Sequence, residues 1–120
     1  QEFLKKNDWQ QLIESCPPLS TGCGLVYESP NYLNRPNENF AIVDMRSISH
    51  AQPHYHPDNN FEFYFILQGS GVIVLGTQEK QVYAGDVLVI PPNTAHFTIP
   101  DNQLVLAVVN TPPYKPENYI

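Results

Sequence analysis

Two histidines and a glutamate stand close together near the middle of the sequence. His54 and His56 are one residue apart, and Glu62 follows after the polar stretch 57–60. Side chains of an extended strand alternate between its two faces, so both imidazoles are expected on one face. Glu62 opens an apolar run, which predicts an antiparallel neighbour that carries a carboxylate. Imidazole and carboxylate groups are metal ligands, so the three side chains predict a metal site inside a β-barrel or sandwich.

His96 is the candidate for a fourth ligand. It follows the apolar run 87–90 and the turn-forming stretch 91–94, in which Asn93 tolerates a left-handed backbone better than most residues. His96 is therefore expected on the strand that comes next. The spacing alone leaves open whether the fold brings His96 to the other three residues.

The composition bounds the fold and the partners. A chain of 120 residues is expected to form one domain, residues 1–120, and twelve prolines argue against a helical protein. The net charge of −6 and the lack of a basic cluster argue against nucleic acid and anionic membranes as partners. No apolar run approaches the roughly 20 residues that span a bilayer, so no membrane segment is expected.

Two features favour a cytoplasmic protein. Residues 1–6 do not form a secretory signal. Cys16 and Cys23 are the two cysteines of the sequence. A short disulfide between them is one interpretation, and two unpaired thiols in a cytoplasmic protein is the favoured one.

The elements that must position the four residues are mainly strands. Residues 8–16 predict a short amphipathic helix with Asp8 as its N-cap, which Pro17 ends. Apolar runs separated by turn signals then predict about nine strands and an all-β antiparallel sandwich or barrel. The predicted strands cover residues 24–28, 40–48, 52–56, 61–68, 71–75, 80–83, 86–90, 96–99 and 103–110. The proline-rich tail, residues 111–120, is expected to be extended.

Both motif-bearing stretches resemble the paired motifs of the cupin superfamily. Proteins of this superfamily are small β-barrels of jelly-roll topology. The first family motif is Gly, five residues, His-x-His, three or four residues, Glu, six residues, Gly. It is matched by His54, His56, Glu62 and Gly69. The second motif is Gly, five residues, Pro-x-Gly, two residues, His, three residues, Asn. It is matched by Gly85, Pro91 and His96, and the resemblance covers roughly residues 38–110.

Four features depart from the family pattern. Ile48 stands at the place of the first glycine, and five residues rather than three or four separate His56 from Glu62. Asn93 replaces the glycine of the second motif, and Pro100 replaces its final asparagine. The set of four ligand residues is nonetheless complete. The longer loop leaves open whether Glu62 ligates, and without it the site would consist of three histidines.

The resemblance implies a single-domain, all-β cupin jelly roll with a short N-terminal helix. It also implies one divalent transition metal held by His54, His56, Glu62 and His96, a set that suits Fe, Mn, Ni, Zn or Cu without choosing among them. The implied function is that of a metal-dependent enzyme, of dioxygenase or lyase/isomerase type, acting on a small polar molecule inside the barrel. The alternative is a non-enzymatic binding or sensing cupin, in which the metal anchors a ligand or serves structure.

Further predictions concern the surroundings of the site. Tyr64 and Ile66 share the strand face of Glu62 and are expected inside the barrel, with Gln68 near its far end. Tyr64 either donates a proton or a hydrogen bond to a substrate or simply packs. Arg46 is a candidate anchor for a carboxylate or phosphate, or else a surface arginine. The opposite, aromatic face needs a cover, which is either an intrachain element or a second copy. A homodimer is therefore expected. That face carries Phe61, Phe63, Phe65 and Leu67.

Overall fold

The computed structural model describes residues 5–15, 19–21, 24–28, 39–46 and 61–111, and the structural statements below concern these residues. They form the helix α1 (Lys6–Ser15) and seven strands. The strands are β1 (Leu19–Thr21), β2 (Gly24–Glu28), β3 (Asn39–Arg46), β4 (Phe61–Leu75), β5 (Gln78–Tyr83), β6 (Val87–Ile90) and β7 (His96–Thr111). Their pairings are antiparallel, which confirms the all-β class. Within this part of the chain, α1 is too short and too polar to cross a membrane.

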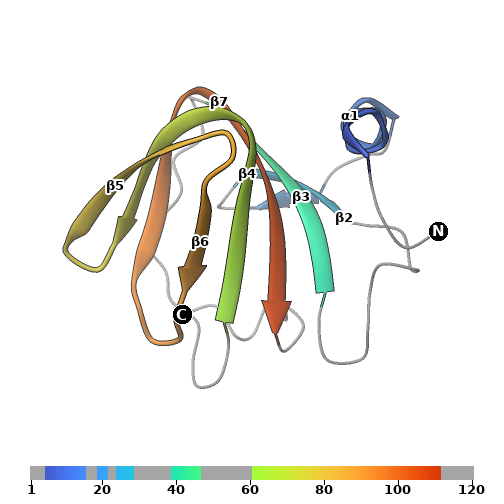
Figure 1. Cartoon of the computed structure of the whole chain (residues 1–120). Helices are drawn as coiled ribbons and strands as arrows, with labels where there is room; N and C mark the ends of the chain where they lie inside the picture. Colours follow the sequence, from blue (N-terminus) through green and yellow to red (C-terminus); the bar gives the residue numbers. More distant parts are fainter. Residues whose placement is uncertain (1–4, 16–18, 22–23, 29–38, 47–60, 112–120) are drawn as a thin grey trace.

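The sheet is built on the two long strands β4 and β7, which pair from one end to the other (Figure 1). The sheet order is β1-β2-β3-β7-β4-β5, with β6 paired to β4. Both long strands bend between their halves, so the sheet folds over into two walls. The first wall contains β1, β2, β3, β6, residues 61–68 of β4 and residues 103–111 of β7. The second wall contains β5, residues 70–75 of β4 and residues 96–100 of β7.

Two glycines permit this bend. Gly69 has a left-handed backbone with a φ of 87°, and a Cβ atom there would overlap the carbonyl oxygen of Gln103. A Cβ atom at Gly71 would lie 2.6 Å from the carbonyl oxygen of Ile99. The backbones of β4 and β7 therefore approach too closely at the bend for a side chain. Register shifts in the β4–β7 ladder lie in the same region, as expected where a bulge adds curvature.

The barrel interior is apolar over most of its length. Every second residue of the long strands points inward, and burial of these side chains favours closure of the sheet. The buried cluster contains Val43, Met45, Tyr64, Ile66, Ile73, Val82, Ile90, Leu104, Leu106 and Val108.

A second, smaller core lies on the outer side of the first wall, under α1. Trp9 and Ile13 of the helix pack there, together with Leu67 of β4 and Val105 of β7. Figure 1 shows α1 beside β2 and β3, away from β5 and β6. The helix therefore covers only one part of the outer surface of the first wall.

The helix begins at Lys6, two residues before the predicted start, because Asp8 is not its N-cap. The backbone N–H of Lys5 donates to Oδ2 of Asp8 at 3.0 Å, and the N–H groups of Asp8 and Trp9 donate to the carbonyl oxygen of Lys5. Asp8 is thus the third helical residue, and its carboxylate reaches back to the N-cap residue Lys5. The N-cap prediction for Asp8 is wrong, although its side chain does stabilise the first turn.

The predicted strands merge into fewer and longer ones. The pairs of predicted runs 61–68 with 71–75, and 96–99 with 103–110, are continuous strands, because the bend does not interrupt the β4–β7 ladder. The sequence pattern misses the three-residue strand β1. The predicted strand 52–56 and the tail after Thr111 lie outside the described residues, as do both cysteines. A single domain over residues 1–120 stays a prediction.

The side of the sheet on which Gln68 lies differs from the prediction. Strict alternation would place it inside the barrel with Glu62 and Tyr64. A register shift between Ile66 and Gln68 instead turns Gln68 to the helix side of the first wall, where it pairs with Val105. Alternation is interrupted wherever a bulge adds one residue to a strand.

Candidate functional site

The barrel brings together two of the four predicted ligands. Glu62 is the second residue of β4 in the first wall, and His96 is the first residue of β7 in the second wall. The Nε2 atom of His96 lies 3.2 Å from Oε1 of Glu62, and the two side chains are only 1% and 4% exposed. The contact therefore crosses the interior and joins the two walls.

The backbone before His96 fixes its position. β6 ends at Ile90, which pairs with Glu62, and the chain then reverses before β7 begins. Asn93 adopts the left-handed conformation expected for it, with a φ of 59°. The N–H of Gly76 donates to the carbonyl oxygen of Ala95 at 2.7 Å, which ties this turn to the end of β4. The turn thus returns the chain into the second wall, with His96 opposite Leu75.

A backbone carbonyl group orients the imidazole ring of His96. Its Nδ1 atom lies 2.9 Å from the carbonyl oxygen of Thr94. A carbonyl oxygen only accepts hydrogen bonds, so Nδ1 carries the proton and donates it. The Nε2 atom then faces Glu62, either as the second N–H of an imidazolium or as the lone pair of a neutral ring. Ligating histidines in metalloproteins commonly use such a carbonyl partner to aim the other nitrogen.

The spacing of the two side chains fits adjacent ligands of one metal ion. Nitrogen and oxygen ligands bind transition metals at about 2.1 Å, so two of them at a right angle lie about 3 Å apart. The separation of 3.2 Å between His96 and Glu62 agrees with that value. His54 and His56 lie outside the described residues. Within the described part of the chain, no group of three or more His, Cys, Asp or Glu side chains is assembled for a metal.

Asn110 is a polar residue of the barrel interior that was not predicted from the sequence. It pairs directly with Glu62 across the β4–β7 ladder, so the two side chains share the inward face. Its side chain is buried, and its Oδ1 atom has no hydrogen-bond partner among the described residues. The period-two pattern of β7 does indicate its inward position, because Leu104, Leu106 and Val108 point inward before it.

Tyr64 and Arg46 occupy different parts of the fold. Tyr64 is 3% exposed and lies two residues after Glu62 on the inward face, within the apolar cluster. Arg46 is the last residue of β3, where its backbone pairs with Gln103. That position is seven residues along β7 from Asn110, or about 23 Å at the usual rise of a strand. The catalytic roles of both residues stay predictions.

Two proteins are similar to part of this chain in sequence. A protein of Methanocaldococcus jannaschii, itself uncharacterized, is 34% identical over 80 residues, which make up 65% of this chain and 62% of that protein. Gentisate 1,2-dioxygenase of Haloferax sp is 29% identical over 70 residues, which make up 58% of this chain and 19% of the enzyme. The matched region thus spans less than two thirds of either relative.

A solved structure and a family model are both similar to this chain. The solved structure of the Streptomyces nucleoside dehydratase Pac13 is similar with a TM-score of 0.65 at 20% identity, over 80% of this chain and 73% of Pac13. The family model of the cupin domain (Cupin_2) matches residues 42–109, more than half of the sequence. The match includes both stretches on which the resemblance to cupins rests. The chain belongs to the cupin family.

Proposed function

We propose that this cupin holds a divalent transition metal through His54, His56, Glu62 and His96. The observation that carries the proposal is the buried contact between Glu62 and His96, whose spacing suits two ligands of one ion. The orientation of the His96 ring by the Thr94 carbonyl group supports it. His54 and His56 precede Glu62 as a His-x-His pair, with one residue more between His56 and Glu62 than the longer form of the family motif has, and they complete the proposed ligand set.

The proposed activity is that of a metal-dependent enzyme acting on a small polar molecule in the barrel. A bound metal would supply a Lewis acid for a carbonyl or alkoxide group, or would activate dioxygen. Asn110 offers its carboxamide oxygen as an acceptor for a substrate hydroxyl or amino group. Tyr64, on the same inward face, offers a phenol group. The apolar side chains around them exclude water, which strengthens each polar interaction with a substrate.

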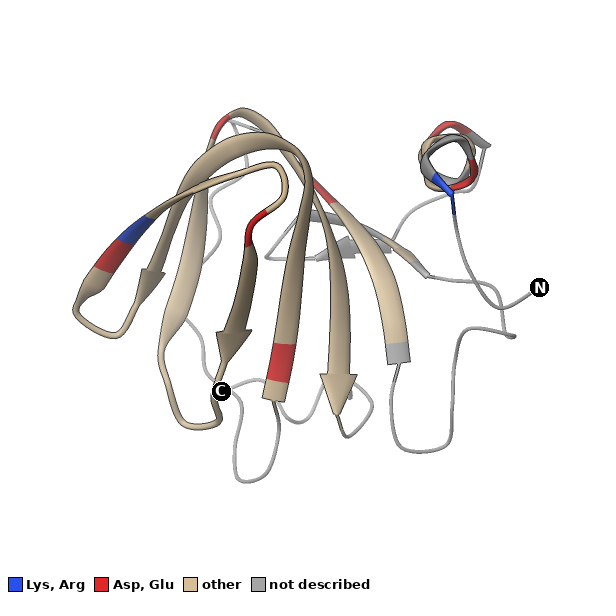
Figure 2. Cartoon of the chain, in the orientation of Figure 1, with Lys and Arg blue, Asp and Glu red and all other residues tan. Residues whose placement is uncertain are grey.

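The distribution of charged side chains supports a particular class of substrate. β4, β6 and β7, which contribute Glu62, His96 and most of the apolar cluster, carry no Lys or Arg (Figure 2). A phosphorylated sugar usually needs several basic contacts, so we favour an uncharged or weakly charged substrate. The similarity to gentisate 1,2-dioxygenase supports a dioxygenase, and the similarity to Pac13 supports a lyase that removes water.

A non-enzymatic binding or sensing protein is the second candidate function. It is favoured by the same contact between Glu62 and His96, because a metal held across the two walls would also crosslink them. In that case chelation would lower the melting temperature sharply, whereas no member of a substrate panel would be consumed.

The test is metal analysis combined with activity. Purified protein reconstituted with Fe, Mn, Ni, Zn or Cu is assayed for bound metal and for oxygen uptake with a panel of phenolic acids, small acids and thiols. About one equivalent of metal is expected in the wild type and much less in His96→Ala, with Glu79→Gln on the exposed strand β5 as control. Equal occupancy in the wild type and His96→Ala, or no binding of any metal, would overturn the proposal.

We also propose that a second copy of the chain covers the outer face of β4 and β6. This face carries Phe61, Phe65, Val87 and Val89, which are between 39% and 59% exposed. Two copies that each carry a net charge of −6 repel one another, and an uncharged face minimises that cost. Among the described strands, β6 pairs with β4 alone, so none of them occupies its other edge, where we place a strand of the second copy.

A further inference from the structure

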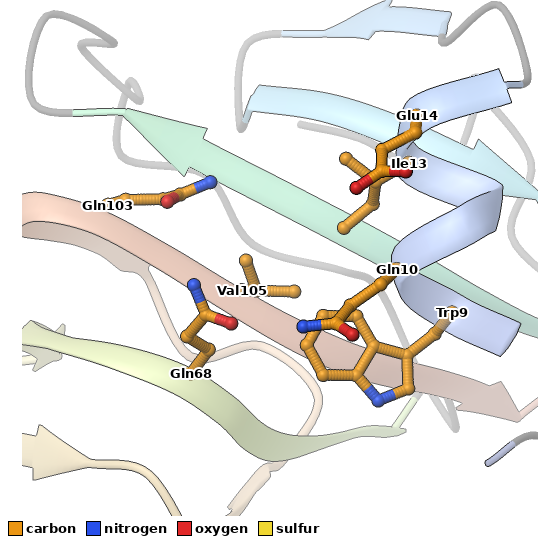
Figure 3. A pocket seen from close by; sticks show the side chains of 7 residues that line it. All are labelled: Trp9, Gln10, Ile13, Glu14, Gln68, Gln103 and Val105. Atoms are coloured by element: carbon orange, nitrogen blue, oxygen red, sulfur yellow. The ribbon is translucent and has the colours of Figure 1, made fainter. Parts of the chain in front are cut away.

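A cleft separate from the barrel interior lies between α1 and the outer side of the first wall (Figure 3). Its volume is about 150 Å³. The helix contributes Trp9, Gln10, Ile13 and Glu14 to its lining, and the strands contribute Gln68, Gln103 and Val105. Such a volume suits a molecule of roughly the size of benzene, with room to extend through the open side.

A hydrogen bond fixes one polar group on the sheet side of the cleft. The Nε2 atom of Gln103 donates to Oδ1 of Asp44 at 2.9 Å, and Asp44 is fully buried. A carboxylate only accepts hydrogen bonds, so this contact assigns the amide nitrogen of Gln103 to Asp44. The carboxamide oxygen of Gln103 is then the atom that remains to serve the cleft as an acceptor.

The bulge in β4 supplies the second polar group of the sheet. Without the register shift after Ile66, Gln68 would point into the barrel with Glu62 and Tyr64. The shift turns its carboxamide group into the cleft, beside Val105. Bulges commonly re-aim a side chain near a site, and here the bulge gives the cleft a donor and an acceptor.

The helix side combines a carboxylate with an apolar wall. Gln10 and Glu14 are four residues apart, so they lie on one face of α1, and Figure 3 shows both projecting towards the sheet. Trp9 and Ile13 of the same helix pack against the outer core, with Val105 below them. The cleft therefore has an apolar floor with polar groups arranged around it, which is the usual construction of a small-molecule site.

The polar groups select the charge of the ligand. Glu14 contributes a carboxylate, the three glutamines contribute carboxamide oxygens, and buried Asp44 lies directly behind Gln103. One amide group is already committed to Asp44, so acceptors outnumber donors in the cleft. No Lys, Arg or His is among its described lining residues. A ligand with several N–H donors and a positive charge matches these lining groups.

We propose that the cleft between α1 and the first wall binds a small organic amine in its protonated form. The ammonium group lies between Glu14 and the carboxamide oxygens of Gln68 and Gln103. The apolar part of the amine contacts Ile13 and Val105. The site is distinct from the interior of the barrel, because its lining lies on the outer side of the first wall.

The fluorescence of Trp9 provides a local measurement. Trp9 is the single tryptophan of the chain, and it is a lining residue of this cleft. Benzylamine, benzyl alcohol and benzoate are matched probes that differ in the charge of one small group. Benzylamine is expected to change the Trp9 emission saturably, with a Kd of about 1 mM. The alcohol is expected to bind at least about threefold more weakly, and benzoate should give no saturable change.

Variants with matched controls locate the binding. Glu14→Gln removes the charge at constant size and is expected to weaken benzylamine binding about threefold to tenfold, whereas Glu79→Gln makes the same change on β5 and should have no effect. Gln68→Ala is expected to weaken binding too, in contrast to Gln81→Ala on the exposed side of β5. His96→Ala should leave benzylamine binding unchanged, because His96 faces the barrel interior.

Three results would overturn the proposal. The first is no saturable Trp9 response to benzylamine. The second is equal binding of the alcohol and the amine with no effect of Glu14→Gln, which would make the cleft a site for neutral molecules. The third is loss of binding in His96→Ala but not in Glu14→Gln, which would place the probe inside the barrel. Retained circular dichroism of each variant shows that a loss of binding does not reflect unfolding.

Discussion

The imidazole of His96 and the carboxylate of Glu62 meet across the barrel at 3.2 Å, although one belongs to the second wall and the other to the first. Thirty-four positions separate them in the sequence, and the fold of β4 and β7 brings them together. Each side chain is nearly fully buried, so their contact lies in a medium less polarisable than water.

Glu62→Gln should weaken the stabilisation of the protein by its metal. The amide keeps the size of the side chain but does not offer an anionic ligand oxygen. A metal at one hundred times its Kd stabilises a protein by about 2.7 kcal/mol, and most of this gain is expected to be lost in the variant. The measurement is the shift in melting temperature on adding Mn²⁺ or Zn²⁺. Glu79→Gln is the charge-matched control, and an unchanged shift in Glu62→Gln would remove Glu62 from the ligand set.

Asn110→Val should separate function from stability. The Oδ1 atom of Asn110 is buried without a hydrogen-bond partner in the described part of the chain, which costs about 1–3 kcal/mol. Replacement by an apolar side chain is therefore expected to leave the free energy of unfolding unchanged or to raise it by about 1 kcal/mol. Substrate turnover or ligand binding in the barrel should fall in the same variant. Urea unfolding and the activity assay are compared, and destabilisation by more than about 1 kcal/mol would indicate a structural role instead.

Gly69→Ala should destabilise the fold severely. Its φ of 87° is unfavourable for alanine, and the added Cβ atom would overlap the carbonyl oxygen of Gln103. We expect a loss of about 3 kcal/mol or more in urea unfolding. Gly76→Ala is the control, because Gly76 also has a positive φ but has no atom within 4 Å of an added Cβ. It should cost only about 1 kcal/mol, and equal losses in both variants would show that the crowding at Gly69 relaxes.

Val89→Lys should shift a dimer towards the monomer. Val89 lies at the centre of the exposed apolar face on β6 and pairs with Phe63. A buried lysine in an interface between two copies would lose its hydration without gaining a partner, which costs several kcal/mol. Sedimentation velocity over a range of concentrations measures the shift. Ile99→Lys alters an equally exposed residue on the second wall and should leave the oligomeric state unchanged. A wild-type monomer at all concentrations would contradict the proposed interface.

The sequence predicts the parts of this structure that depend on local period and turn chemistry. The alternation from Glu62 to Ile66, the left-handed turn residue Asn93 and the all-β class follow from short stretches of sequence, and the structure confirms them. The orientation of Gln68 was not predictable, because it follows from the register shift between Ile66 and Gln68, which depends on how β4 pairs with the distant strand β7. The residue types around the β4 bulge do not indicate this shift.

Contacts between positions far apart in the sequence could not be predicted either. Asp44 and Gln103 are 59 residues apart, and nothing near either residue in the sequence indicates that they form a hydrogen bond. Asn110 is a milder case, because the inward pattern of its strand was readable. Its importance arises only from its position opposite Glu62.

The shared strands β4 and β7 also determine how the barrel can come apart. Both walls contain half of each strand, so neither wall is an independent unit. Opening either wall would strain the ladder that holds the other, which favours one cooperative transition over stepwise loss of the sheets. Amide protons in residues 61–68 and in residues 70–75 should therefore exchange with solvent deuterium through the same rare global event.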